Sequence, residues 1–151
     1  MSDAADIARL TSELGYEVAA ADVEARLGRL LSRSEHLILI AEHEARAVGW
    51  VHVMVAEYIE IDRFAAIAGL VVDSSCRRSG IGRMLMERAE QWARDQGCSI
   101  VRLSSSTPRS AAHRFYEQLG YANVKTQYTF AKSLDATRPL EVSKLVPRVP
   151  P

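Results

Sequence analysis

The stretch LVVDSSCRRSGIGR, which runs from Leu70 to Arg83, decides the fold of this chain. It begins inside an apolar run, residues 67–72, that is typical of a strand buried on both faces. A polar connection follows, and Gly80 and Gly82 open an amphipathic segment with helical periodicity that extends to Gln96. Because glycine lets a ligand approach the backbone and a first helical turn offers free N–H groups, this strand, loop and helix predict an anion site.

Three arginines, Arg77, Arg78 and Arg83, make a phosphate or pyrophosphate the expected anion, since no acidic residue lies between them. The loop differs from two common phosphate loops. No Lys-Ser/Thr pair follows the second glycine, which excludes a Walker A loop, and Leu85 stands where a dinucleotide fingerprint has its third glycine.

The remaining pattern, Arg-x-x-Gly-x-Gly after an apolar strand, resembles the coenzyme A loop of the GNAT acetyltransferases. Residues 112–121, which read AHRFYEQLGY, resemble the later helix of that family, whose core is Phe-Tyr, three residues, then Gly and an aromatic residue. The two motifs lie about thirty residues apart with a helix and a strand between them, as in the family. The resemblance covers residues 4–134.

The resemblance implies an α/β (α+β) GNAT fold with helices on both faces of a mixed, mostly antiparallel sheet. The sheet is expected to splay into a V between two parallel strands, residues 67–72 and 99–103. Because the helical pattern starts at Asp3, the first strand that members usually have is expected to be missing or very short. The sheet edge left exposed in this way is compatible with a homodimer.

Local patterns predict the other elements. Helices are expected at residues 3–15, 22–31 and 110–119, strands at 37–41 and 48–55, and one strand or two closely joined strands at 124–134. Residues 1–135 are expected to form the acetyltransferase domain. Because prolines gather at positions 139, 147, 150 and 151, residues 136–151 are expected to be an extended or disordered tail.

By resemblance, acetyl-CoA is expected to lie in the V as a co-substrate, and no metal is expected. Its pyrophosphate would meet the amides of residues 78–83, and its pantetheine arm would pair with the main chain of Leu70 and Val72. Ser106 stands where an asparagine often contacts the cofactor in the family. The expected cofactor contacts are Leu70, Val71, Val72, Arg77, Arg78, Ser79, Gly80, Ile81, Gly82, Arg83, Ser106, Phe115 and Tyr116.

The reaction needs a base, an oxyanion donor and an acid. A backbone N–H near Leu70 or Val71 would stabilise the oxyanion. By resemblance, Tyr116 is the general acid that protonates the leaving sulfur, and an ordinary tyrosine pKa near ~10 allows this at neutral pH.

The base is open. Some relatives use a carboxylate on the central strand, but residues 66–69 carry none. The candidates for the base or for acceptor binding are Glu57, Glu60 and Asp62. His113 is a weaker candidate, equally suited to packing or capping, and His52 is expected to be structural or to face the substrate.

The distribution of charge limits the kinds of partner that the chain can bind. The chain has 19 Lys+Arg and 19 Asp+Glu, which excludes a general nucleic-acid or membrane-surface binder. Residues 1–62 hold 12 acids against 5 bases, whereas residues 63–151 hold 7 acids against 14 bases. We therefore expect an anionic co-substrate at the basic loop and a cationic acceptor near the acidic run. The absence of a long apolar run and the two cysteines favour a protein of the reducing cytoplasm.

The leading interpretation is an N-acetyltransferase that acts on a primary amine of a small molecule, or on an amino terminus, by direct attack in a ternary complex. A second is a GNAT-fold module that binds CoA as a sensor without turnover. A third is a nucleotide-binding protein of another kind.

Overall fold

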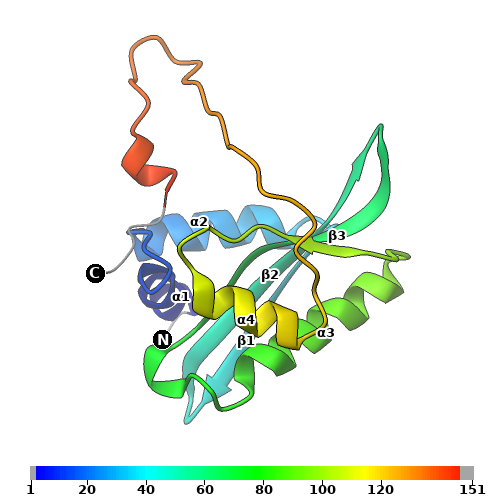
Figure 1. Cartoon of the computed structure of the whole chain (residues 1–151). Helices are drawn as coiled ribbons and strands as arrows, with labels where there is room; N and C mark the ends of the chain where they lie inside the picture. Colours follow the sequence, from blue (N-terminus) through cyan, green and yellow to red (C-terminus); the bar gives the residue numbers. More distant parts are fainter. Residues whose placement is uncertain (1–2, 147–151) are drawn as a thin grey trace. The chain divides into compact units, whose positions relative to one another are not determined.

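The computed structural model describes residues 3–146, in two units that comprise residues 3–104 and 105–146. The first unit contains α1 (Asp3–Ser12), α2 (Ala20–Leu31), β1 (His36–His43), β2 (Arg46–Tyr58), β3 (Ile61–Val72), a short 3-10 helix (Ser74–Cys76), α3 (Ile81–Asp95) and β4 (Val101–Leu103) (Figure 1). The second unit contains α4 (Ser110–Gln118) and a short 3-10 helix (Val142–Lys144).

The four strands form one sheet in the order β1-β2-β3-β4. β1, β2 and β3 pair in an antiparallel manner, and β4 lies parallel to β3. The mixed, mostly antiparallel sheet is therefore confirmed. Among the described residues the chain reaches the sheet only after α1 and α2, as the helical pattern from Asp3 predicted.

Helices cover both faces of the sheet, and β2 shows which face each one covers. A Cβ added at Gly49 would lie 3.4 Å from the side chains of Ile81 and Leu85, so this residue faces α3. The next residue, Trp50, packs against a buried cluster that α1 and α2 form with Ala4, Ile7 and Val23. Because side chains alternate along a strand, odd residues of this part of β2 face α3 and even residues face α1 and α2.

The first unit has an apolar core on the face that α1 and α2 cover. Ala4, Ile7 and Leu10 are buried at helical spacing on α1, which is why the amphipathic pattern forms a helix there. Trp50 packs against two groups of buried residues. These groups are Ala4, Ile7 and Val23 in one, and Leu10, Ala47 and Val71 in the other.

The parallel strands stay together over a short length only. β3 and β4 pair at Ala65↔Val101, Ala66↔Arg102 and Ile67↔Leu103. β3 continues to Val72 with β2 as its partner on the other side. The two parallel strands therefore part after Ile67, which is where the splay was predicted.

The strand predicted over residues 124–134 is wrong, because residues 121–135 have no regular secondary structure. Alternation is present in the sequence, but Val124, Tyr128, Phe130 and Leu134 are 82–93% exposed. A strand gains its main-chain hydrogen bonds from a neighbour, and in the part of the chain that the structure describes no strand pairs with this segment.

The tail prediction rests largely on residues outside the described part. The prolines at 147, 150 and 151 lie beyond residue 146, and the boundary at residue 135 stays a prediction. No helix within residues 3–146 is long and apolar enough to cross a membrane.

A glycine substitution tests the packing of α3 on β2. In Gly49→Ala the new Cβ would lie 2.9 Å from the Val71 carbonyl oxygen, as well as against α3. We expect the free energy of unfolding to fall by about 1–3 kcal/mol in urea denaturation, the range for overpacking. The control is Gly28→Ala, where nothing lies within 4 Å and α2 should gain up to about 1 kcal/mol. Equal effects of the two substitutions would contradict this packing.

Candidate functional site

Asp73 directly follows β3 and is the start of the site. It is 7% exposed, and its Oδ1 accepts hydrogen bonds from the Ser75 hydroxyl at 2.6 Å and the Ser75 N–H at 3.0 Å. Its Oδ2 accepts a hydrogen bond from Arg9 Nη1 at 2.6 Å. The bonds from Ser75, and then that from Arg9, lower the pKa of Asp73 from 3.8 to about 2. The carboxylate is therefore a charged anchor at the point where the chain leaves the sheet.

Arg9 connects α1 to this anchor. Besides Asp73, its guanidinium donates to the Ala47 carbonyl oxygen at 2.7 Å and to Asp6 Oδ1 at 3.3 Å. The three bonds use separate nitrogens of one planar group, which fixes its orientation. α1 is thereby fastened to both the start of β2 and the end of β3.

Glu13, which follows α1, fastens the loop itself. Its two carboxylate oxygens accept hydrogen bonds from Arg77 Nη2 and from the Ser74 hydroxyl, each at 3.0 Å. Arg77 Nε also donates to the Val72 carbonyl oxygen at 3.4 Å. Arg77, an expected cofactor contact, is thus already engaged by its own unit.

The backbone reverses just before α3. Arg78 and Gly80 adopt positive φ angles of 60° and 87°, and the Ser79 hydroxyl donates to the Cys76 carbonyl oxygen. Gly80 is the N-cap and supplies no side chain, while its carbonyl accepts from the Met84 N–H at 3.0 Å. The amides of Ile81, Gly82 and Arg83 precede the first intrahelical donor, so the start of α3 offers them to an anion.

The orientation of the β3 main chain decides what the V can bind. The Asp73 N–H donates to the Val48 carbonyl oxygen of the neighbouring segment at 2.8 Å. Main-chain groups alternate along an antiparallel pair, so those of Leu70 and Val72 point away from β2. β4 has ended at Leu103 by this level. This edge can therefore accept an extended ligand as an additional strand.

The three acidic candidates lie at the tip of the β2–β3 hairpin, which projects from the sheet in Figure 1. Glu57, Glu60 and Asp62 are all exposed there. Asp62 is five residues before Ile67, which corresponds to roughly 16 Å along a strand. A general base must come within hydrogen-bond reach of its proton, directly or through one water. Their position favours a part in acceptor binding over proton transfer at the splay.

Tyr116, Phe115, Ser106 and His113 belong to the second unit. The Tyr116 ring makes edge contacts with Phe115 and Tyr121, at centroid distances of 5.2 and 6.0 Å. Burial raises the pKa of Tyr116, with a smaller opposing effect of Arg109. The phenol therefore keeps its proton at neutral pH.

His113 stands within hydrogen-bond distance of the loop before α4. Its Nε2 lies 3.0 Å from the Ser106 carbonyl oxygen, and a carbonyl only accepts, so the imidazole nitrogen donates. The contact agrees with the structural interpretation of this histidine. The Ser106 residue itself is exposed.

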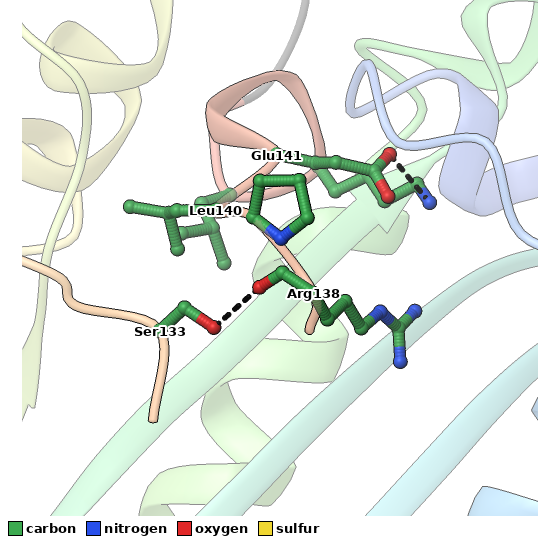
Figure 2. A pocket seen from close by; sticks show the side chains of 7 residues that line it. Ser133, Arg138, Leu140 and Glu141 are labelled. Carbon is green, nitrogen blue, oxygen red and sulfur yellow. Dashed lines mark hydrogen bonds and ion pairs between the residues drawn. The ribbon is translucent and has the colours of Figure 1, made fainter. Parts of the chain in front are cut away.

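A hollow in the second unit lies apart from these residues in the sequence (Figure 2). In it, the Ser133 hydroxyl donates to the Arg138 carbonyl oxygen at 2.6 Å, and Lys144 pairs with Glu141 at 2.6 Å. None of the predicted site residues lines it. Its lining residues are Ser133, Arg138, Pro139, Leu140, Glu141, Lys144 and Leu145.

Local sequence patterns do not reveal the residues that hold the loop in place. Arg9 and Glu13 are 64 residues away from their partners Asp73 and Arg77, so no local pattern connects them. The available signal was Asp73 itself, a single charge at the end of an apolar strand, which needs a partner when buried.

Comparisons with known proteins agree with this geometry. The model of the Acetyltransferase (GNAT) family matches residues 4–121. The Bacillus subtilis (strain 168) protein named uncharacterized N-acetyltransferase YhdJ is 35% identical over 116 residues, which are 74% of this chain and 80% of that protein. Aminoglycoside N(6')-acetyltransferase type 1 of Acinetobacter haemolyticus is 25% identical over 111 residues, 71% of this chain and 77% of that protein. A solved structure of aminoglycoside N-acetyltransferase AAC(6')-Iy in complex with CoA has a TM-score of 0.78 at 17% identity, and the match covers 87% of this chain and 91% of that one.

Acid unfolding tests the Asp73 anchor. Because the pKa of Asp73 is lower in the folded state, its contribution is fully present above pH 3.8 and is lost as the pH falls towards about 2. At pH 7 we expect Asp73→Asn to cost about 1.5–3 kcal/mol, as a hydrogen bond to a charged group does. Urea unfolding between pH 7 and pH 2 should show this difference shrinking for Asp73→Asn and staying constant for the exposed control Asp62→Asn. A difference that does not change with pH would contradict the anchor.

Proposed function

The chain belongs to the GNAT family of acetyltransferases, and we propose that this acyl-CoA-dependent N-acetyltransferase moves the acetyl group of acetyl-CoA directly to a primary amine in a ternary complex. The amine belongs to a small molecule or to an amino terminus. The observation that carries the proposal is the parting of β3 and β4 after Ile67, next to the uncapped start of α3. An open strand edge beside an anion site matches an extended ligand that ends in a diphosphate.

Different residues of the first unit bind different parts of acetyl-CoA. The amides of Ile81, Gly82 and Arg83 bind the pyrophosphate, with charge from Arg78 and Arg83. Arg77, which is engaged by Glu13 and by the Val72 carbonyl oxygen, holds the loop. The carbonyl oxygen of Leu70, together with the Val72 N–H, pairs with the pantetheine arm.

The reaction then needs one donor at the developing oxyanion. The free amine attacks the thioester carbonyl carbon, and the carbonyl oxygen gains negative charge. The N–H of Leu70 points to the open edge, whereas that of Val71 points to β2, so Leu70 is the donor. Tyr116 gives its proton to the leaving sulfur, and its raised pKa keeps that proton available.

The acceptor is a cationic amine. The acidic tip of the β2–β3 hairpin attracts such a molecule, and the names of relatives that acetylate aminoglycosides support polyamino acceptors. Aminoglycoside-like and polyamine-like compounds are therefore the first acceptors to test.

Tyr116→Phe tests the acid. We expect turnover to fall by about 10²-fold, because a general acid typically contributes this much or more. The affinity for acetyl-CoA should change less than about twofold, since binding rests mainly on the main chain and the loop. Release of the CoA thiol over a panel of amines measures turnover, and calorimetry measures binding.

The control for Tyr116→Phe is Tyr128→Phe, which makes the same change at a side chain that is 91% exposed. A wild-type protein that binds acetyl-CoA but acetylates no amine in the panel would favour the CoA sensor. Binding of ATP or NAD without CoA affinity would favour the third interpretation.

A triple variant, Glu57→Gln, Glu60→Gln and Asp62→Asn, tests the cationic acceptor. We expect KM for a polyamine to rise about three- to tenfold at low salt and this difference to shrink at high salt, because exposed charges are screened. KM for acetyl-CoA and kcat should stay unchanged. The control, Glu42→Gln with Glu44→Gln, removes charge near the opposite end of β2. A preference of the wild-type protein for neutral or acidic acceptors would contradict the proposal.

A further inference from the structure

Two histidines form a hydrogen-bonded pair on neighbouring strands of the sheet. His36 begins β1 and His52 lies in the middle of β2. Nδ1 of His36 and Nε2 of His52 are 3.0 Å apart, and the rings stack with their centroids 5.2 Å apart. One nitrogen must donate and the other accept, so the accepting nitrogen carries no proton. When Nε2 of His52 donates, its Nδ1 keeps a lone pair.

The pair lies on the sheet face where the central strand has little side-chain bulk. His52 and Met54 are even residues of β2 and so share the face of Trp50. Opposite them on β3 stand Gly69 and Ala66. These small residues carry no acid or base, and the Trp50 ring on the same face of β2 packs over Gly69, where an added Cβ would lie 2.7 Å from it.

The level of His52 along the sheet matches the proposed reaction centre. Its cross-strand partner Gly69 adjoins Leu70, whose N–H is the proposed oxyanion donor. Neighbouring strands are about 5 Å apart and the splay lies on the far side of β3 from β2, so a bridging water carries the proton from an amine at the splay to the imidazole. The hairpin carboxylates are several times farther away along the strands.

The protonation state of His52 suits a base. Burial lowers the pKa of His52, and the neighbouring His36 lowers it further. At neutral pH the imidazole is therefore uncharged and able to accept a proton.

We propose that His52 is the general base that deprotonates the acceptor ammonium, and that His36 positions its imidazole. This inference rests on the acetyl transfer proposed above. His52 takes one proton from the ammonium, and the free amine attacks the thioester carbonyl to form the C–N bond. The C–S bond breaks, the sulfur takes the Tyr116 proton, and the phenolate regains a proton from the acylated nitrogen. His52 then releases its proton to solvent, so the products are the amide, CoA thiol and one proton.

The choice of acceptor gives a direct test of His52. With an alkylamine, which is protonated at pH 7, we expect His52→Gln to lower kcat by about 10²-fold. With an acceptor that is already unprotonated at pH 7, such as a hydrazide, the loss should shrink to less than about fivefold because no ammonium proton has to be removed first. The ratio of the two losses does not depend on the fraction of folded protein. Acetyl-CoA affinity should stay within about twofold.

Two variants of His36 test the positioning role. The asparagine side chain in His36→Asn would still offer an oxygen to His52, so this variant should keep most of the alkylamine activity, whereas His36→Phe should lose about tenfold. The matched control is His43→Gln, at a histidine whose side chain is 70% exposed near the turn of the same hairpin. It should behave as wild type.

The outcomes separate this inference from the proposed function. An active wild-type protein with equal losses on both acceptors in His52→Gln, or with no loss, overturns the role of His52 and leaves acetyl transfer intact. Equal activities of His36→Asn and His36→Phe overturn the positioning role of His36. A wild-type protein that acetylates neither acceptor overturns the proposed function itself.

Discussion

The main-chain groups of β3 beyond Ile67 impose the constraint on which the rest of the site depends. A buried strand must satisfy its N–H and C=O groups, yet β4 ends at Leu103 and leaves the outward groups of Leu70 and Val72 facing an open edge. In a sheet without a function such an edge would be covered or shortened. Here it runs into the turn that opens α3, where Arg77 Nε bonds the Val72 carbonyl oxygen, so the open edge and the free helix amides lie along the track that we propose for acetyl-CoA.

A β-bulge decides which residues face that track. Before the bulge, the Ala65 N–H donates to the Ile100 carbonyl oxygen on the β4 side, so odd residues face β4. The register between β2 and β3 then shifts by one residue, because Val53 pairs with Ile67 while His52 pairs with Gly69. After the extra residue, even residues face outward. The bulge thus turns the Leu70 amide to the open edge and keeps Val71 in the core.

The sequence predicted the parts of the fold whose causes are local. Gly80 and the helical spacing of apolar residues after it predicted α3, which runs over Ile81–Asp95. The predicted strand over residues 67–72 proved to be the second half of a longer one, because Asp62 and Arg63 are exposed on the hairpin tip and polar residues are tolerated there. Residues 124–134 alternate as a strand does, but alternation cannot supply a neighbour.

The candidate site was predictable to the same extent. The glycine-containing loop is a local motif and could be predicted. The ion pairs that hold this loop join residues far apart in the chain. The contact between His36 and His52 depends on the exact register of the β1–β2 hairpin.

One physical cause underlies both of the proposed proton-transfer roles. Burial disfavours the charged form of any group. For the imidazole of His52 this lowers the pKa, and for the phenol of Tyr116 it raises the pKa. Each residue is therefore held in its neutral form before reaction, and the neutral imidazole is the form that accepts a proton while the neutral phenol is the form that gives one. Residues 66–69 of the central strand supply no carboxylate that could serve instead. The neutral imidazole of His52 is therefore the proton acceptor that we propose for this face of the sheet.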